Sequence, residues 1–145
     1  MSGPTNRPTD QQVIRLEQPV AWGEQDAFGH LNNVVYFRYF ENVRMYFLER
    51  VGILRSHQRA GIGVILAHTS CQFERPVKWP MQLAVVTWCS AIGTTSFTLA
   101  YEILDERNEV VATGTSVQVM YDYGAAHKVP VPEDVRTAIA ALQGS

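Results

Sequence analysis

EQDAFGHLNNVVYFRYFENVR, residues 24–44, joins a polar, glycine-containing loop to a long apolar segment. From Val34 to Val51 the chain has helical periodicity, and residues at steps of about 100° share one stripe: Tyr36, Phe40, Val43, Phe47 and Val51. Phe37, Tyr39 and Tyr46 widen this stripe well beyond the face of an ordinary amphipathic helix. The sequence therefore predicts a helix that is largely enclosed by the rest of the domain.

Residues typical of helix boundaries flank both ends of this helix. The segment from Gly23 to Asn33 is typical of a structured loop, and its Asn32 or Asn33 is a candidate N-cap. Gly52 is typical of the residue after a helix C-terminus. The basic, glycine-punctuated segment that follows, from Leu54 to Gly63, is expected to form a loop.

Beyond this loop the apolar period changes from about 3.6 to two, which is typical of β-strands. The expected strands are Val64–Phe73, Leu83–Ile92, Ser96–Leu104 and Val110–Tyr121, with a hairpin turn at Asp105–Asn108. Upstream, Val13–Trp22 is expected to form an edge strand because Pro19 interrupts it. Pro132 and Glu133 open a short terminal helix from Val131 to Leu142.

The order of these elements predicts an α+β domain. One antiparallel sheet of about five strands is expected to wrap around the only helix long enough to fill it. Such a sheet leaves edge strands, which dimerisation could cover. Residues 1–12 are expected to form a flexible tail, and residues 13–145 a single domain.

Composition limits the classes of function. The chain has 145 residues, 46% of them apolar and 18% charged, which suits one folded domain. A net charge of −2 gives no footprint for nucleic acid. No apolar run is long enough for a membrane span or a signal peptide. Cys71 and Cys89 stand alone, without metal-ligand spacing, so we expect no metal and a soluble protein of the reducing cytoplasm.

Asp26 is the candidate for chemistry, because it lies in the loop that leads into the enclosed helix. A helix start presents unpaired N–H groups and partial positive charge, which suit a developing oxyanion. The backbone N–H of Asn33 is the candidate for that contact, and Asp26 for a general base or nucleophile. The alternative is a solvated loop aspartate that caps a turn. His30 could orient a substrate or bond the loop backbone.

Other polar residues have structural interpretations. Glu24 would share a face with Asp26 in an extended chain, yet a surface position is the better interpretation. Glu41 and Arg44 are expected to form an ion pair along the helix. A loose basic set flanks the second strand and could meet phosphates: Arg55, His57, Arg59, Arg75 and Lys78.

The helix-entry segment resembles the 4-hydroxybenzoyl-CoA thioesterase group of the hotdog-fold superfamily. The resemblance rests on the spacing D-x-x-G-H-x-N-N-x-x-Y-x-x-Y-x-E-x-x-R, which runs from Asp26 to Arg44. It continues through Phe73–Pro76, the Ile92–Ser96 turn and the strand that ends at Tyr121, and covers about Val13 to Pro132.

The resemblance implies a hotdog fold and a homodimer or homotetramer with active sites between subunits. It implies that Asp26 attacks the thioester or activates water, while the N–H of Asn33 polarises the thioester oxygen, with His30 beside them. Substrate-binding residues are then Gly29, Tyr36, Arg75, Lys78 and Ser96. No cofactor is expected, since coenzyme A is part of the substrate.

The sequence therefore predicts an acyl-CoA thioesterase that acts on a small-molecule substrate. Three alternatives remain open: a non-catalytic acyl-CoA-binding hotdog protein, a thioesterase for acyl-carrier-protein thioesters, and a hotdog dehydratase or hydratase. The last would use a histidine with an acidic partner on the central helix, which offers Glu41 but no histidine.

Overall fold

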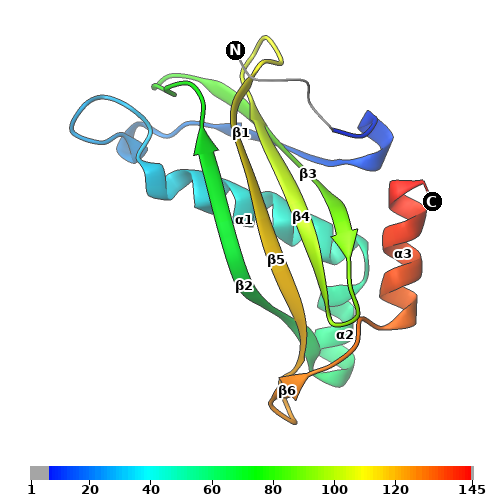
Figure 1. Ribbon diagram of the computed structural model, residues 1–145. Coiled ribbons are helices and arrows are strands. Elements are labelled where there is room, and N and C mark those ends of the chain that lie inside the picture. Colours follow the sequence, from blue (N-terminus) through cyan, green and yellow to red (C-terminus); the bar gives the residue numbers. More distant parts are fainter. Residues whose placement is uncertain (1–6, 145) are drawn as a thin grey trace.

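The computed structural model describes residues 7–144, and one antiparallel sheet dominates it (Figure 1). Its strands are β1 (Ile14–Pro19), β2 (Ile62–Phe73), β3 (Gln82–Ile92), β4 (Ser96–Leu104), β5 (Val110–Asp122) and the short β6 (His127–Lys128). The order is β1-β3-β4-β5-β2, with β6 paired to β5. The predicted strands are confirmed, and β1 lies at an edge as expected.

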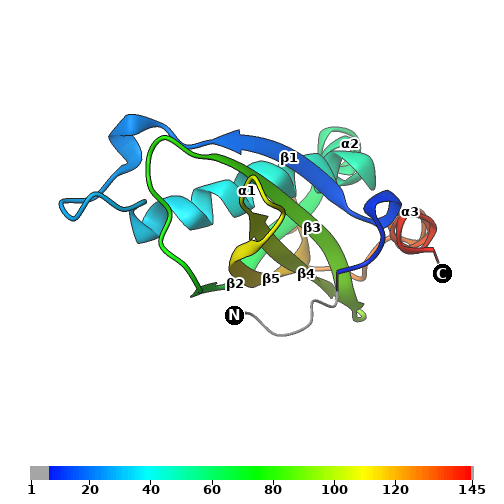
Figure 2. The ribbon, with the colours of Figure 1, turned by 90° about the horizontal axis from the view of Figure 1, so that it is seen from above.

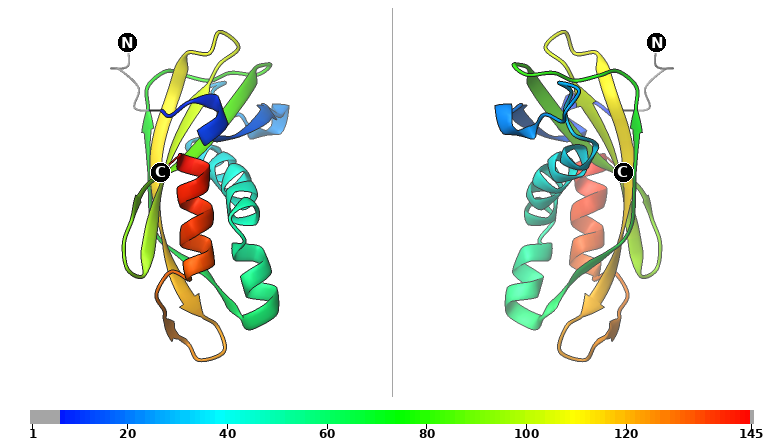
Figure 3. Two further views of the ribbon diagram at one scale, coloured as in Figure 1. Left: turned by 90° about the vertical axis from the view of Figure 1, so that its right-hand side faces the viewer. Right: turned by 90° about the vertical axis from the view of Figure 1, so that its left-hand side faces the viewer.

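Within residues 7–144, three α-helices accompany the sheet: α1 (Asn33–Arg50), α2 (Ile53–Ala60) and α3 (Glu133–Gln143). Seen from above, the sheet curls around α1 (Figure 2), and seen edge-on it has the helices on one side (Figure 3). This arrangement confirms the predicted α+β hotdog fold with a long central helix.

Aromatic side chains fill the space between α1 and the sheet. Tyr39, Phe40 and Phe47 are fully buried, and the ring of Phe40 stacks on that of Tyr101 from β4 at 4.5 Å between centroids. One apolar face of β4 is wholly buried: Phe97, Leu99, Tyr101 and Ile103. The predicted enclosure of the helix is therefore confirmed.

The segment from Leu54 to Gly63 corrects the sequence prediction, because α2 occupies most of the expected loop. Gly52 and Gly61 flank the helix in left-handed conformation, with φ of 88° and 70°. Ile53 is its one buried residue. A helix this short depends on such caps and on tertiary packing for its stability, and its basic, glycine-flanked sequence is also typical of a loop.

The N-terminal residues that the structure describes lie against the domain. Asp10–Gln12 forms a 3-10 turn, and Arg7 pairs with the carboxylate of Glu102 on β4. Gln12 and Gln143 exchange hydrogen bonds of 2.8 and 2.9 Å between side-chain amides and backbone carbonyls. The remainder of the predicted tail, residues 1–6, lies outside the described residues. Among residues 7–144, no helix combines the length and apolar character needed to cross a membrane.

Candidate active site

The loop before α1 is closed by hydrogen bonds of its own backbone. The N–H of Asn32 donates to the carbonyl of Glu24 (3.0 Å), and the N–H of Asp26 donates to that of His30 (2.7 Å). Gly29 turns the chain at the tip with a φ of 76°. The loop is thus a small, tied structure that holds Asp26 in one place.

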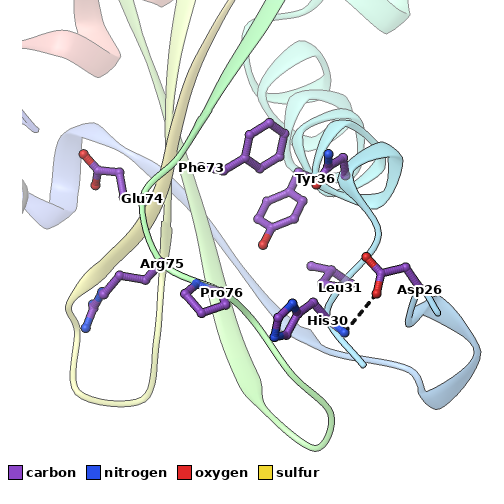
Figure 4. Close-up of a pocket in the computed structure, with 9 residues that line it drawn as sticks. Asp26, His30, Leu31, Tyr36, Phe73, Glu74, Arg75 and Pro76 are labelled. Atoms are coloured by element: carbon purple, nitrogen blue, oxygen red, sulfur yellow. Dashed lines mark hydrogen bonds between the residues drawn. The ribbon is translucent and has the colours of Figure 1, made fainter. Parts of the chain in front are cut away.

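The carboxylate of Asp26 has one bound oxygen and one free oxygen. Its Oδ1 accepts hydrogen bonds from the N–H groups of Phe28 (2.9 Å) and His30 (3.2 Å). Figure 4 shows the bond from His30. Within residues 7–144, no donor contacts Oδ2. The turn-capping role that the sequence leaves open is therefore real, but it occupies only one of the two oxygens.

The start of α1 offers an unpaired N–H group beside this carboxylate. Asn32 is the N-cap: its side chain accepts from the N–H of Val34 (3.1 Å), and its carbonyl from that of Val35 (2.9 Å). The N–H of Asn33 has no acceptor in the described part of the chain. A free N–H at a helix start is suited to bind an anionic oxygen.

Asp26 and Asn33 border one cavity of about 240 Å³ between the start of α1 and the end of β2. The cavity is lined by Asp26, His30, Leu31, Asn33, Tyr36, Phe73, Glu74, Arg75 and Pro76. The rings of Tyr36 and Phe73 meet edge to face at 4.8 Å and form one wall. Burial raises the pKa of Tyr36 to about 12, so its hydroxyl stays protonated at neutral pH. The site combines a carboxylate, a free N–H and an aromatic wall.

Arg75 borders the cavity, but its guanidinium is engaged elsewhere. It pairs with the carboxylates of Glu109 (2.8 Å) and Asp105 (3.5 Å) and bonds the carbonyl of Val110 (3.1 Å). In Figure 4 its side chain points away from Asp26. These contacts give Arg75 a structural role at the hairpin between β4 and β5.

Lys78 and Ser96 do not border the cavity within one chain. Lys78 is exposed in the connection from β2 to β3 and makes no ion pair within residues 7–144. Ser96 begins β4 opposite Val119, and Val119 pairs in turn with Ile65, far along β2 from the cavity residue Phe73. Gly29 lies at the loop tip and does not line the cavity.

Two charged residues of the motif have structural contacts. Arg44 is buried and donates to the hydroxyl of Tyr101 (3.2 Å), while its predicted pairing with Glu41 is confirmed at 3.9 Å. Glu24 does not lie free at the surface, because its carboxylate accepts a hydrogen bond of 2.6 Å from Tyr39. Its spacing from Asp26 gave no signal of this contact, since Tyr39 comes from the following helix.

Metal ligands do not gather at this site. Among the described residues, no group of three His, Cys, Asp or Glu side chains is arranged to hold a metal ion. The groups that the cavity offers to a reaction are therefore the Asp26 carboxylate, the Asn33 N–H, the Tyr36 hydroxyl and the His30 imidazole.

Comparisons with known proteins give the family. The profile of the thioesterase-like superfamily matches residues 20–139. The YsmA protein of Bacillus subtilis is 32% identical over 100 residues, which are 69% of this chain and 67% of that protein. The PA5185 structure from Pseudomonas aeruginosa has a TM-score of 0.78 at 28% identity and covers 94% of this chain and 96% of its own.

A more distant structure shares the fold. The DHNA-CoA thioesterase of Staphylococcus aureus has a TM-score of 0.80 at 18% identity, with 91% of each chain covered. The family match, rather than this likeness, confirms the predicted enzyme class of thioester hydrolases. Since the profile spans strands β2 to β6, the central helix and the cavity described above, the chain belongs to the thioesterase-like superfamily.

Proposed function

We propose that this protein hydrolyses acyl-CoA thioesters to the free carboxylic acid and CoA, with Asp26 as the catalytic residue. One observation carries the proposal: Asp26, whose Oδ2 is unbound, and Asn33, whose N–H is unbound, line the same cavity. A thioester placed there has an acid–base group and an oxyanion donor within one site.

The proposed chemistry follows from these two groups. The N–H of Asn33 binds the thioester oxygen as negative charge develops on it. Oδ2 of Asp26 takes a proton from a water molecule as that water attacks the carbonyl carbon, and the proton then passes to the departing CoA sulfur. Direct attack by the carboxylate, followed by hydrolysis of the resulting anhydride, uses the same two groups. His30 and Tyr36 shape the space for the acyl end.

A binding protein without catalysis is the second candidate. Such a protein needs a cavity but has no use for a carboxylate oxygen left without a structural partner. Acyl-carrier-protein thioesters present the same reacting bond, so a panel of acyl-CoA and carrier-protein thioesters separates the substrates. For the phosphates of CoA, Lys78 is the better of the two predicted cations, because Arg75 is engaged by Glu109.

Replacing Asp26 by Asn tests the catalytic role. The amide oxygen of Asn still accepts from the N–H groups of Phe28 and His30, so the loop keeps its shape. An amide cannot take a proton, and we expect kcat to fall by about 10²- to 10⁴-fold. Release of free CoA is measured with a thiol reagent, and calorimetry checks that CoA still binds. Wild-type turnover by Asp26→Asn would refute the assignment.

The exposed β2 supports a dimer that completes the site. β2 is a 12-residue edge strand whose residues 65–70 are all exposed. Antiparallel pairing of two β2 strands about their midpoint brings Phe73 of one chain next to Ile62 of the other. The start of β4 then approaches the neighbouring cavity, because Ser96 is joined through Val119 to the first half of β2. We therefore propose that Ser96 serves the site of the partner subunit.

Mixing two inactive variants tests this arrangement. Asp26→Asn lacks the catalytic group, and Ser96→Glu places a negative charge at the proposed contact with the anionic substrate. In a mixed dimer one site has both native residues, so equal mixing should restore about a quarter of wild-type activity at low substrate concentration. Light scattering should give twice the 16.3 kDa of one chain. A mixture that stays inactive would place both residues in the same subunit's site.

A further inference from the structure

Tyr39 carries a polar contact inside an apolar core. Its side chain is fully buried on α1, and its hydroxyl donates a hydrogen bond of 2.6 Å to Oε1 of Glu24. Burial and this bond both raise the pKa of Tyr39, so the hydroxyl remains a donor throughout the working pH range. A phenylalanine ring would pack in this apolar core equally well, so packing alone does not explain the hydroxyl of Tyr39.

Glu24 is the residue where the Asp26 loop begins and closes. Its Oε1 also accepts from the N–H of Ala21 (2.8 Å), and its carbonyl accepts from the N–H of Asn32 (3.0 Å). The loop from Gln25 to Leu31 thus begins after Glu24 and is closed by a hydrogen bond to the same residue. Whatever fixes Glu24 fixes the base of the whole loop.

The Tyr39 contact connects the two halves of the proposed catalytic site. Asp26 belongs to the loop, whereas Asn33 belongs to α1, which also carries Tyr39. Neither Tyr39 nor Glu24 lines the cavity, so neither can touch the substrate there. Their bond acts on the distance between the carboxylate and the oxyanion donor, and an error of about 1 Å in such a distance can cost about 10²-fold in rate.

We propose that Tyr39 and Glu24 are positioning residues whose hydrogen bond sets the Asp26 loop against the start of α1. This inference rests on the proposed function. It assigns the second tyrosine of the motif a role in the site, although that side chain never meets the acyl group.

Tyr39→Phe removes the bond and keeps the buried ring. We expect kcat to fall about 10-fold or more, while KM and CoA affinity stay within about twofold, because the substrate contacts remain. The matched control is Tyr46→Phe, which removes a hydroxyl from the same helix at a side chain 54% exposed. That control should match the wild type. Equal losses in kcat and CoA affinity would instead indicate a general structural role and overturn the inference.

Variants of Glu24 test the other end of the bond. Glu24→Gln keeps an oxygen acceptor for Tyr39 and Ala21, so it should retain far more turnover than Glu24→Ala. Combining Tyr39→Phe with Glu24→Ala should cost no more than Glu24→Ala alone, because both changes break one contact. Independent, multiplying losses would show that the two residues act separately.

Hydrogen exchange separates this inference from the proposed function. Without the hydrogen bond between Tyr39 and Glu24, the amides of the Asp26 loop should exchange faster in Tyr39→Phe than in Tyr46→Phe, whether or not the protein turns over a thioester. The amides to follow are those of Asp26, Phe28 and His30. A wild type inactive on every thioester, with faster exchange in the variant, would reject the function and keep the contact. Unchanged exchange and unchanged kcat in Tyr39→Phe would overturn the inference itself.

Discussion

Gly29 governs how the carboxylate of Asp26 is held. The two N–H groups that bind Oδ1 belong to Phe28 and His30, on either side of this glycine. Its φ of 76° turns both donors toward the same oxygen. A side chain at Gly29 would meet nothing within 4 Å, so the backbone conformation is the only requirement for glycine here.

Gly29→Ala should therefore strain the backbone without a steric clash. Left-handed conformation costs an L-residue about 1–2 kcal/mol, and we expect the free energy of unfolding to fall by about 1 kcal/mol. Relaxation of the turn also misaligns Asp26, which should lower kcat. Denaturant titration and CoA release measure the two effects.

Gly23→Ala is the matched control for this change. Gly23 lies in the same segment, has no positive φ, and an added Cβ meets nothing within 4 Å. It should leave stability unchanged or slightly raised, since alanine restricts the unfolded chain. Equal effects of the two substitutions would mean that the turn at Gly29 is not a source of strain.

The parts of the site that sequence reasoning could find are close together in the chain. Asp26, Asn33 and Tyr36 follow from one loop and the first turn of one helix, and the structure brings them to one cavity. The position of the Arg75 side chain is set instead by the neighbouring hairpin, where its guanidinium pairs with the carboxylate of Glu109. The spacing of residues along a chain cannot reveal that a carboxylate from another strand connection binds the arginine in place of a substrate phosphate.

At the scale of elements, α1 and β5 pack closely at Gly114. A Cβ at Gly114 would lie 2.4 Å from a ring carbon of Phe40 and 2.6 Å from the carbonyl oxygen of Ser70. Because Gly114 has no side chain, the ring of Phe40 on α1 packs directly on the sheet. Phe40 also stacks on Tyr101, so it has little room to move aside.

Gly114→Ala should push α1 away from the sheet. Overpacking a core costs about 1–3 kcal/mol, and we expect the upper end because one of the clashing atoms is backbone. Thermal unfolding should show a lower Tm. Gly93→Ala is the control, since its added Cβ would meet Ser96 at an ordinary 3.6 Å. If Gly114→Ala were as stable as that control, the packing of Phe40 on β5 would be looser than described.

The alternation of β5 could be predicted from sequence, but the buried face could not. One face reads as apolar and β-branched, whereas the face toward α1 carries Gly114, Ser116 and Gln118, and the two polar side chains are fully buried. They are satisfied in a chain of hydrogen bonds: Arg44 to Tyr101, Tyr101 with Ser116 at 2.6 Å, and Ser116 to Gln118. Buried polar residues are stable only with partners, and these partners come from three separate elements.

At the scale of the whole molecule, the contact between α1 and β2 keeps a thiol and a phenol protonated. Burial raises the pKa of the Cys71 thiol on β2 from 9.0 to about 12. Burial likewise raises the pKa of Tyr36 on α1 from 10.0 to about 12. The folded state therefore holds these protons more tightly than the unfolded chain does.

The stability of the fold should consequently decrease at alkaline pH. A raised pKa contributes stability that is complete below the unfolded value and is lost as pH rises toward the folded value. We expect Tm to be level up to about pH 9 and to fall progressively between about pH 9 and pH 12. Thermal unfolding followed by circular dichroism over this range measures the decline.

The two partly buried thiols account for the first part of this decline, because a thiol has a lower pKa than a phenol in the unfolded chain. Burial raises the pKa of Cys89 as well. Replacing both Cys71 and Cys89 by Ser should therefore delay the fall to about pH 10, where the tyrosines begin to titrate in the unfolded chain. The phenolic share remains, since Tyr36 is untouched. A double variant that loses stability from the same pH as the wild type would show that the thiols are not held protonated by the fold.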